Sequence, residues 1–299
     1  MSVKFSFQLP KVQEQSGANP MSPGISMRGG NGVAVILVHG LTGTPNEMGF
    51  LANRLNTSGF SVLCPRLANH DRPLQVLKNT PWQDFYETVR QAYFKTREYS
   101  DTIFVSGLSM GALLGLLLAE EFSQSVAGVS CLSPTLFYDG WNCPWYRCFL
   151  PVVYWTRLHH FLYFEESPPY GIKNESLRRR VHDYFSKADA KNHSDIDRYG
   201  YPLFPVSQLR QLELLVKHLK PRLPKVTSPV QIIQAREDDM TSVRNAEFIY
   251  NRVSSKDKEM VLLNDSYHII TADQERGKVL DNMKNFFMRF SKQREPAHV

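Results

Sequence analysis

A serine lies between two glycines in the segment Gly-Leu-Ser-Met-Gly at residues 107–111. The bare Gly-x-Ser-x-Gly pattern occurs by chance in many chains. Here it follows the β-branched run 102–106 and opens the run 110–119, which is rich in Leu and Ala. A tight turn from a strand into a helix holds a serine hydroxyl clear of a sheet, where it can act as a nucleophile. We therefore predict that Ser109 is a nucleophile.

A hydroxyl attacks poorly unless a base removes its proton, and histidine is the usual base. The chain has nine histidines. Of these, His268 follows the last strand-like run, residues 259–263, and precedes the last helical pattern. We predict that His268 is the base.

The imidazole needs a carboxylate to hold its tautomer and stabilise its charged form. Glu237, Asp238 and Asp239 follow the strand-like run 230–235. We favour Asp238, which falls at the turn after that strand, while spacing alone leaves Asp239 open. Ser, Asp and His then occur in the chain order typical of α/β-hydrolases.

An acyl-transfer site also needs backbone N–H donors for the oxyanion. Met110 is one candidate, because it follows the nucleophile. The other is Leu41, in the loop that starts with His39 and Gly40 after the apolar run 33–38. We expect His39 to prop this loop by hydrogen bonding rather than to act as an acid or base.

Strand-length apolar runs alternate with amphipathic runs of helix length along most of the chain. The expected strands are residues 33–38, 60–64, 102–106, 126–132, 230–235 and 259–263, and the expected helices are residues 45–58, 81–99, 109–122, 242–252 and 272–290. Residues 11–32 are rich in Gly, Pro, Ser and Asn and are expected to be loop. The alternation predicts a doubly wound, mainly parallel α/β sheet.

The alternation stops across residues 134–224. This segment holds three of the four tryptophans and many other aromatic residues. We expect a helical, aromatic-rich cap inserted into a core made of residues 1–133 and 225–299. The aromatic run 145–155 would pack on the core, line an acyl channel or touch a lipid surface, and basic residues beside it suit an anionic interface. Trp145 and Trp155 are therefore candidate substrate contacts.

Composition restricts the partners and the compartment. The net charge of +6 permits attraction to anionic surfaces, but the densest basic cluster, residues 178–180, is too short to indicate nucleic acid binding. The N-terminus has no apolar core of a secretory signal, and the longest apolar stretch is too short to span a bilayer. We expect a cytoplasmic protein without a nucleic acid partner.

The four cysteines fall into two groups. Cys64 and Cys131 end apolar runs and are expected to be buried small hydrophobes. Cys143 and Cys148 are close enough in sequence to pair, but free thiols are favoured in a reducing compartment. No Cys/His spacing resembles a zinc site, and acyl transfer needs no cofactor. We expect neither a metal nor a cofactor.

Together these motifs resemble the bacterial carboxylesterase and monoacylglycerol lipase family of α/β-hydrolases. The family's Gly-Leu-Ser-Met-Gly turn is identical to residues 107–111, and its His-Gly-[Phe/Leu]-Thr-Gly oxyanion loop matches residues 39–43. Its Ala-Arg-x-Asp-x-Met segment, matched by residues 235–240, implies that Asp238 is the acid. Its His-[Val/Ile]-Ile-Thr segment, matched by residues 268–271, implies that His268 is the base. The resemblance covers residues 33–133 and 229–290 and departs from the family at the long, aromatic cap.

The resemblance implies hydrolysis of a small-molecule carboxylic ester through an acyl-Ser109 intermediate. A thioesterase or an acyltransferase would use the same residues, and no sequence feature separates them. A non-catalytic binding protein is disfavoured because Ser109, Asp238 and His268 are all present. A peptidase is disfavoured because no acidic pair that would hold a free amino terminus can be picked out. The sequence does not predict the oligomeric state.

Overall fold

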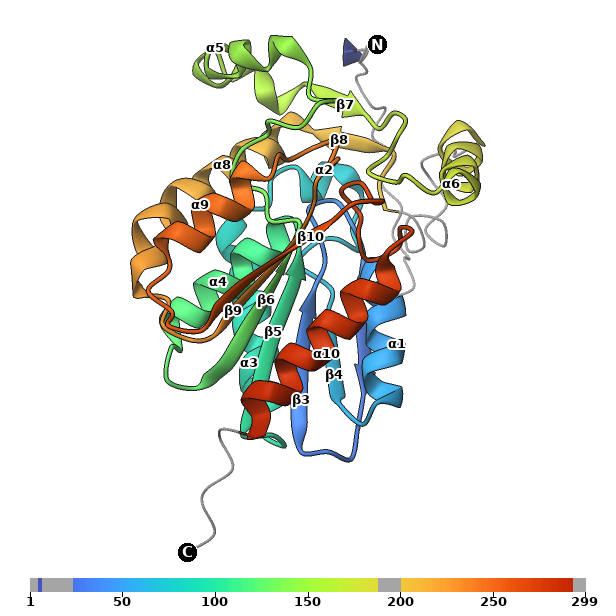
Figure 1. Cartoon of the computed structure of the whole chain (residues 1–299). Coiled ribbons are helices and arrows are strands. Elements are labelled where there is room, and N and C mark those ends of the chain that lie inside the picture. The colour runs from blue at the N-terminus through green and yellow to red at the C-terminus, as the bar shows by residue number, and fades with distance from the viewer. Residues whose placement is uncertain (1–4, 7–23, 188–199, 293–299) are drawn as a thin grey trace, which may run out of the picture.

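A seven-stranded sheet forms the centre of the molecule (Figure 1). The computed structural model describes residues 5–6, 24–187 and 200–292. The strand order is β10-β9-β6-β5-β3-β4-β2, and all neighbours are parallel except β2, which runs antiparallel to β4. The strands are β2 (Gly24–Met27), β3 (Val33–Val38), β4 (Ser61–Pro65), β5 (Thr102–Leu108), β6 (Val126–Leu132), β9 (Val230–Ala235) and β10 (Lys258–Leu263).

Helices cover both faces of this sheet. On one face lie α1 (Gly49–Thr57) and α10 (Arg276–Lys292). On the other lie α3 (Trp82–Arg97), α4 (Met110–Glu121), α8 (Val206–Leu219) and α9 (Arg244–Arg252). Two short helices lie between these elements: η1 (Pro45–Met48) directly precedes α1, and α2 (Leu74–Leu77) lies between β4 and α3. Because both faces are covered, β3, β4, β6 and β9 are buried throughout, which explains their continuous apolar runs. The predicted doubly wound α/β-hydrolase fold is confirmed.

The structure differs from the sequence-based expectation at the edge of the sheet. The sequence predicts loop at residues 24–27, but these residues form β2 and pair with β4. Only Ile25 and Met27 of this short strand pack against the core, so its sequence carries little apolar signal. The remaining part of the predicted loop that precedes β2 lies outside the described residues.

The segment between β6 and β9 lies over the carboxyl ends of the strands (Figure 1). It contains η2 (Trp145–Phe149), α5 (Leu150–Trp155), η3 (Leu158–His160), β7 (Tyr163–Glu165), α6 (Glu175–Lys187) and β8 (Leu203–Pro205), followed by α8 and η4 (Lys220–Lys225). β7 pairs antiparallel with β8 and with β1 (Phe5–Ser6) in a small second sheet. The insertion therefore holds strands as well as helices.

Helix α8 falls within the predicted cap but packs with the sheet domain. Leu209, Leu212, Leu215 and Leu219 are buried in the same apolar cluster as α3 and α4. In sequence this helix follows the irregular part of the insertion with no long strand between them, so local patterning gave no sign that it rejoins the core.

In the part of the chain that the structure describes, no helix is both long and apolar enough to cross a membrane.

Candidate active site

Ser109 occupies the sharp turn between β5 and α4. Its φ of 57° and ψ of −115° lie in a region that non-glycine residues rarely adopt. Its backbone N–H donates to the carbonyl of Leu132, with an N···O distance of 2.9 Å, which ties the turn to β6. This is the strained strand-to-helix turn that the sequence predicted.

Two glycines make this turn sterically possible. A Cβ atom on Gly107 would lie 2.2 Å from the backbone of Gly111. A Cβ atom on Gly111 would lie 2.2 Å from the carbonyl oxygen of Val38. The missing side chains let the start of α4 lie directly against β3 and β5.

The hydroxyl of Ser109 is hydrogen-bonded to the hydroxyl of Thr135, with an O···O distance of 2.8 Å. Thr135 follows β6 and is buried. The oxygen of Ser109 makes no hydrogen bond to His268 in this conformation. Rotation about the Cα–Cβ bond of Ser109 would redirect its hydroxyl. Hydrogen bonds between a catalytic nucleophile and its base commonly form or shorten only when substrate binds.

His268 and Asp238 form a buried pair. The imidazole Nδ1 of His268 lies 2.8 Å from Oδ2 and 3.1 Å from Oδ1 of Asp238. The two residues follow β10 and β9, which are adjacent parallel strands, so their loops meet at one sheet edge. Burial alone lowers the pKa of His268, but the charge and hydrogen bond of Asp238 outweigh it and raise that pKa above its ordinary value.

Further donors fix the carboxylate of Asp238. It accepts hydrogen bonds from the backbone N–H groups of Met240 and Thr241 and from the side chains of Gln234 and Thr241, at distances of 2.8–3.0 Å. Asp239, which spacing left open, faces elsewhere: it accepts from the backbone N–H of His268 at 3.3 Å. Of the two neighbours, Asp238 is the one that contacts the imidazole.

The two predicted oxyanion donors come from two different segments, the start of α4 and the loop after β3. Met110 is the first residue of α4, so its backbone N–H has no acceptor within the helix. Leu41 lies in the loop after β3 and lines the same cavity as Ser109. His39 props this loop, because its Nδ1 is 2.8 Å from the carbonyl of Gly40 and its Nε2 accepts from the backbone N–H of Leu67.

Ser109 and His268 open into one cavity of about 680 Å³ between the sheet and the insertion. Much of its wall is apolar. The apolar lining residues include Leu41, Leu108, Leu150, Phe164, Ile172, Leu177, Val181, Phe185, Phe204, Leu212 and Ile269. Cys143 also lines the cavity, and all four cysteines are free, so Cys143 and Cys148 are not paired.

Sequence reasoning missed two glutamates in this cavity, Glu47 and Glu166. Burial raises the pKa of Glu47 to about 7, although a hydrogen bond from the backbone N–H of Gly40 opposes this. Burial, with the nearby charges of Asp239 and Glu47, raises the pKa of Glu166 to about 7. No sequence signal joins the two, because they come from η1 and from the segment after β7.

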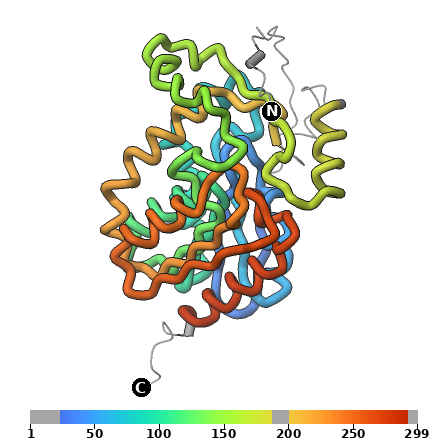
Figure 2. Tube along the Cα trace, turned by 45° about the horizontal axis from the view of Figure 1, so that its top comes forward, coloured from blue at the N-terminus to red at the C-terminus, as the bar shows by residue number. Residues whose placement is uncertain are grey.

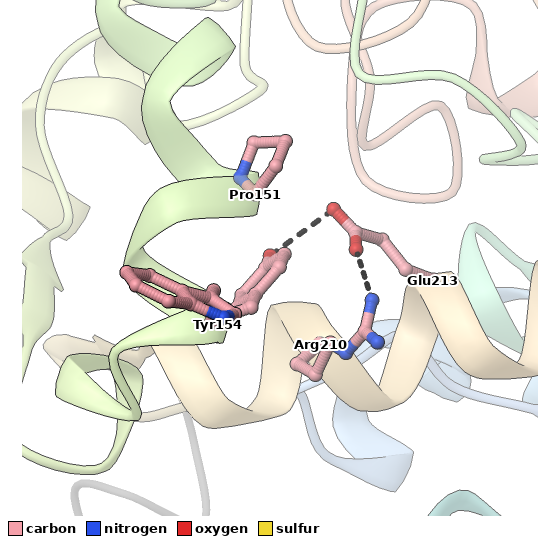
Figure 3. Close-up of a pocket in the computed structure, with 5 residues that line it drawn as sticks. Pro151, Tyr154, Arg210 and Glu213 are labelled. Atoms are coloured by element: carbon pink, nitrogen blue, oxygen red, sulfur yellow. Dashed lines mark hydrogen bonds and ion pairs between the residues drawn. The ribbon is translucent and has the colours of Figure 1, made fainter.

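The structure does not bring Trp145 and Trp155 to this cavity. They are 77% and 85% exposed, on η2 and α5. Trp155 instead borders a second, smaller hollow between α5 and α8, where Tyr154 and Arg210 both point at Glu213 (Figure 3). That these tryptophans contact an acyl group stays a prediction.

Among the described residues, no group of three or more His, Cys, Asp or Glu side chains is arranged to hold a metal ion.

The fold and the strained serine turn define a serine hydrolase of the α/β-hydrolase type. Residues 31–275 match the model of the Hydrolase_4 family, described as serine aminopeptidase, S33. The chain belongs to this family.

Two bacterial relatives match most of the chain. A thermostable monoacylglycerol lipase of Bacillus sp. (strain H-257) is 29% identical over 257 residues, covering 86% of this chain and 91% of that protein. A carboxylesterase of Bacillus subtilis (strain 168) is 26% identical over 263 residues, covering 86% of this chain and 93% of that protein. The resemblance seen in the motifs is confirmed by these relatives.

Solved structures share the fold. The chain matches a structure from work on LipS and LipT, two metagenome-derived lipolytic enzymes, with a TM-score of 0.70 and 26% identity, covering 89% of this chain and 96% of that one. It matches the monoacylglycerol lipase of Paleococcus ferrophilus with a TM-score of 0.71 and 17% identity, covering 89% of this chain and 98% of that one.

Proposed function

We propose that this protein hydrolyses carboxylic esters through an acyl-Ser109 intermediate. His268 takes the proton of the Ser109 hydroxyl as that oxygen attacks the ester carbonyl. The oxyanion that forms accepts hydrogen bonds from the backbone N–H groups of Leu41 and Met110. His268 then gives its proton to the departing alcohol. Water, activated by the same imidazole, releases the acid and restores Ser109.

One observation carries this proposal: the buried contact of 2.8 Å between His268 and Asp238, beside the cavity that also contains Ser109. The contact leaves Nε2 as the nitrogen that can exchange a proton with Ser109. Asp238 holds this tautomer and stabilises the imidazolium that forms during attack. The names of the bacterial relatives support an ester rather than another acyl donor.

The test compares the wild type with Ser109→Ala and His268→Ala. We expect wild-type hydrolysis of p-nitrophenyl butyrate and labelling by a fluorophosphonate probe. Ser109→Ala should lose both, and His268→Ala should lose nearly all turnover. A folded Ser109→Ala variant that kept wild-type turnover would contradict the proposal. Product analysis with an acyl-CoA donor and with an added alcohol separates hydrolysis of esters from thioester hydrolysis and from acyl transfer.

The cavity supports a substrate with an aliphatic acyl chain, because apolar side chains make up much of its wall. We expect a panel of p-nitrophenyl esters to show a defined chain-length optimum. The sequence-based hypothesis predicts that Trp145→Ala or Trp155→Ala shifts this optimum. A flat profile that neither substitution changes would contradict both.

A second candidate function is cleavage of substrates that carry a free ammonium group. The family description names an aminopeptidase, and the sequence alone offered no acidic pair to hold an amino terminus. Glu47 and Glu166 line the cavity of Ser109 and supply two carboxyl groups. Leucine p-nitroanilide and its N-acetyl derivative test this function. Turnover of leucine p-nitroanilide but not of its N-acetyl derivative, lost in Glu47→Gln or Glu166→Gln, would favour this function. If neither substrate were turned over, ester hydrolysis would remain as the one proposed reaction.

We also propose that residues 141–161, here named the arm, contact a lipid surface. Seven of the ten exposed large apolar side chains among the described residues lie on the arm: Trp141, Trp145, Phe149, Val152, Trp155, Leu158 and Phe161. Residues 140–164 contain no Asp or Glu, but they include two arginines and two histidines. In Figure 2 the α5 part of the arm projects from the body of the molecule. This combination fits an anionic bilayer surface.

The arm also forms part of the cavity rim, because Asn142, Pro144, Arg147 and Leu150 line the cavity. Contact with a bilayer would bring the rim to a source of acyl esters. We expect co-sedimentation with vesicles containing phosphatidylglycerol, weaker binding to phosphatidylcholine alone, and loss of binding in the double variant Trp145→Ala/Trp155→Ala. Phe94→Ala, which removes an aromatic side chain that is 50% exposed on α3, is the matched control. Equal sedimentation of all variants would contradict lipid contact.

A further inference from the structure

Asp239 joins the loop of His268 to the insertion. One oxygen of its carboxylate accepts the backbone N–H of His268 at 3.3 Å, and the other accepts the backbone N–H of Gly171 at 3.2 Å. Asp239 is 2% exposed. Burying a carboxylate has a high free-energy cost unless hydrogen-bond donors compensate it. Both bonds to Asp239 therefore favour the observed positions of His268 and Gly171.

Residues 170–174, here named the strap, run along the loop that carries His268. The backbone N–H of Ile269 donates to the carbonyl of Gly171 at 2.8 Å. The carboxylate of Asp273 accepts the backbone N–H groups of Lys173 and Asn174, each at 2.8 Å. The same carboxylate accepts the N–H of Tyr267 at 2.8 Å. The strap is therefore fastened on both sides of His268.

The strap also lies close to His268. Gly171 has a φ of +70°, and a Cβ atom there would lie 2.8 Å from Cγ1 of Ile269 and 3.2 Å from Cβ of His268. Only glycine combines this backbone conformation with so little space. On the outer side, Nζ of Lys173 lies 2.6 Å from Glu237 and 3.1 Å from Asp265, one residue from each of the two loops.

We propose that Asp239 is a positioning residue, which acts with the strap to hold His268 where its imidazole meets Asp238. This inference rests on the proposed role of His268 as the base. Asp238 holds the ring, whereas Asp239 and the strap hold the backbone that carries the ring. The insertion therefore helps to position His268, in addition to enclosing the cavity.

The role of Asp239 has an electrostatic side that a purely structural contact would lack. The acidic groups that act on the imidazole are Asp238, Asp239, Glu47 and Glu166. The negative charge of Asp239 raises the pKa of His268. Removing that charge favours the neutral imidazole and should move the acid limb of the pH profile to lower pH.

The test uses Asp239→Asn, Gly171→Ala and the control Glu175→Gln. Glu175 begins α6 directly after the strap, and its exposed carboxylate pairs with Arg179. Asp239→Asn should shift the acid limb of kcat/KM to lower pH and reduce kcat. Gly171→Ala should reduce kcat by roughly 10²-fold, the scale of a small misplacement of a reacting group, without moving the limb to lower pH. Glu175→Gln should change neither.

NMR titration of the His268 imidazole, assigned with His268→Gln, gives a readout that needs no turnover. We expect Asp239→Asn to lower the pKa of His268, and Gly171→Ala to weaken the low-field Nδ1–H signal of its bond to Asp238. Unchanged titration and unchanged Nδ1–H signals in both variants would overturn the inference. If both variants changed the NMR signals as expected but the fluorophosphonate probe did not label the wild type, the result would instead contradict the proposed function.

Discussion

At the scale of single residues, neighbouring carboxyl groups differ sharply in their surroundings. Asp238 contacts the imidazole of His268 and accepts four further hydrogen bonds. Asp239 faces the backbone of His268 and the strap. Glu47 and Glu166 face the cavity. Each environment predicts a different consequence of neutralising the group.

Asp238→Asn should reduce kcat by about 10⁴-fold, because an amide neither fixes the productive tautomer nor stabilises the imidazolium. Steady-state kinetics with p-nitrophenyl butyrate measure this loss. Asp239→Asn, which keeps the carboxylate of Asp238 as the partner of the ring, should cost less. If Asp239→Asn were the more damaging change, Asp238 would not be the orienting acid.

Glu47 and Glu166 should make stability fall as the pH rises. Burial raises the pKa of each to about 7, so the folded protein binds their protons more tightly than the unfolded chain does. The stability from these protons is fully present below the unfolded pKa and is lost as the pH rises towards about 7. Glu47→Gln/Glu166→Gln should therefore raise Tm, relative to wild type, more at pH ~8 than at pH ~5. Thermal unfolding at both pH values measures this, and an equal Tm difference would contradict it.

At the scale of elements, the serine turn depends on how closely α4 approaches the sheet. Gly111 lies where any side chain would strike the carbonyl of Val38. Farther along the same helix, a Cβ atom on Gly115 would lie 3.1 Å from a methyl group of Val105, which is a side-chain atom that can move. The two glycines thus differ in what they permit.

Gly111→Ala should destabilise the fold by about 3 kcal/mol or more, because a backbone clash forces the helix away from β3. Gly115→Ala, in the same helix, should change stability by only about 1 kcal/mol, since the helix propensity of Ala offsets the crowding. Urea unfolding followed by circular dichroism measures both. Equal stability of the two variants would contradict this prediction, because it would show that α4 can move away from β3 without loss of stability.

At the scale of the whole molecule, the sheet domain and the arm differ in burial. α4 has ten buried residues, whereas η2, α5 and η3 have none. Tyr154 joins α5 to α8 through Glu213, which Arg210 also contacts (Figure 3). Few apolar contacts therefore hold the arm to the body.

Hydrogen exchange should be faster in residues 145–160 than in α4, because segments with few buried contacts open at low free energy. Mass spectrometry of peptides from the two regions measures this. Tyr154→Phe, which removes the hydrogen bond to Glu213, should speed exchange in the arm and leave α4 unchanged. Equal protection of the arm and α4 in the wild type would contradict the difference in burial.

The sequence by itself determined those features that local physics encodes. Strands buried on both faces need continuous apolar runs, and a serine turn against a sheet needs glycines at 107 and 111, so both are visible along the chain. Ser109, Asp238 and His268 each follow a strand-like run, and the carboxyl ends of parallel strands meet at one edge of a sheet.

Only the tertiary structure decided how distant or adjacent groups face one another. Asp238 and Asp239 are chemically identical neighbours, and only the path of the loop turns one to the imidazole and the other to the strap. Glu47 and Glu166 share a cavity although they lie far apart in sequence. The exposure of Trp145 and Trp155 likewise depends on packing, because aromatic residues occur both in buried cavity walls and on exposed surfaces that contact a partner.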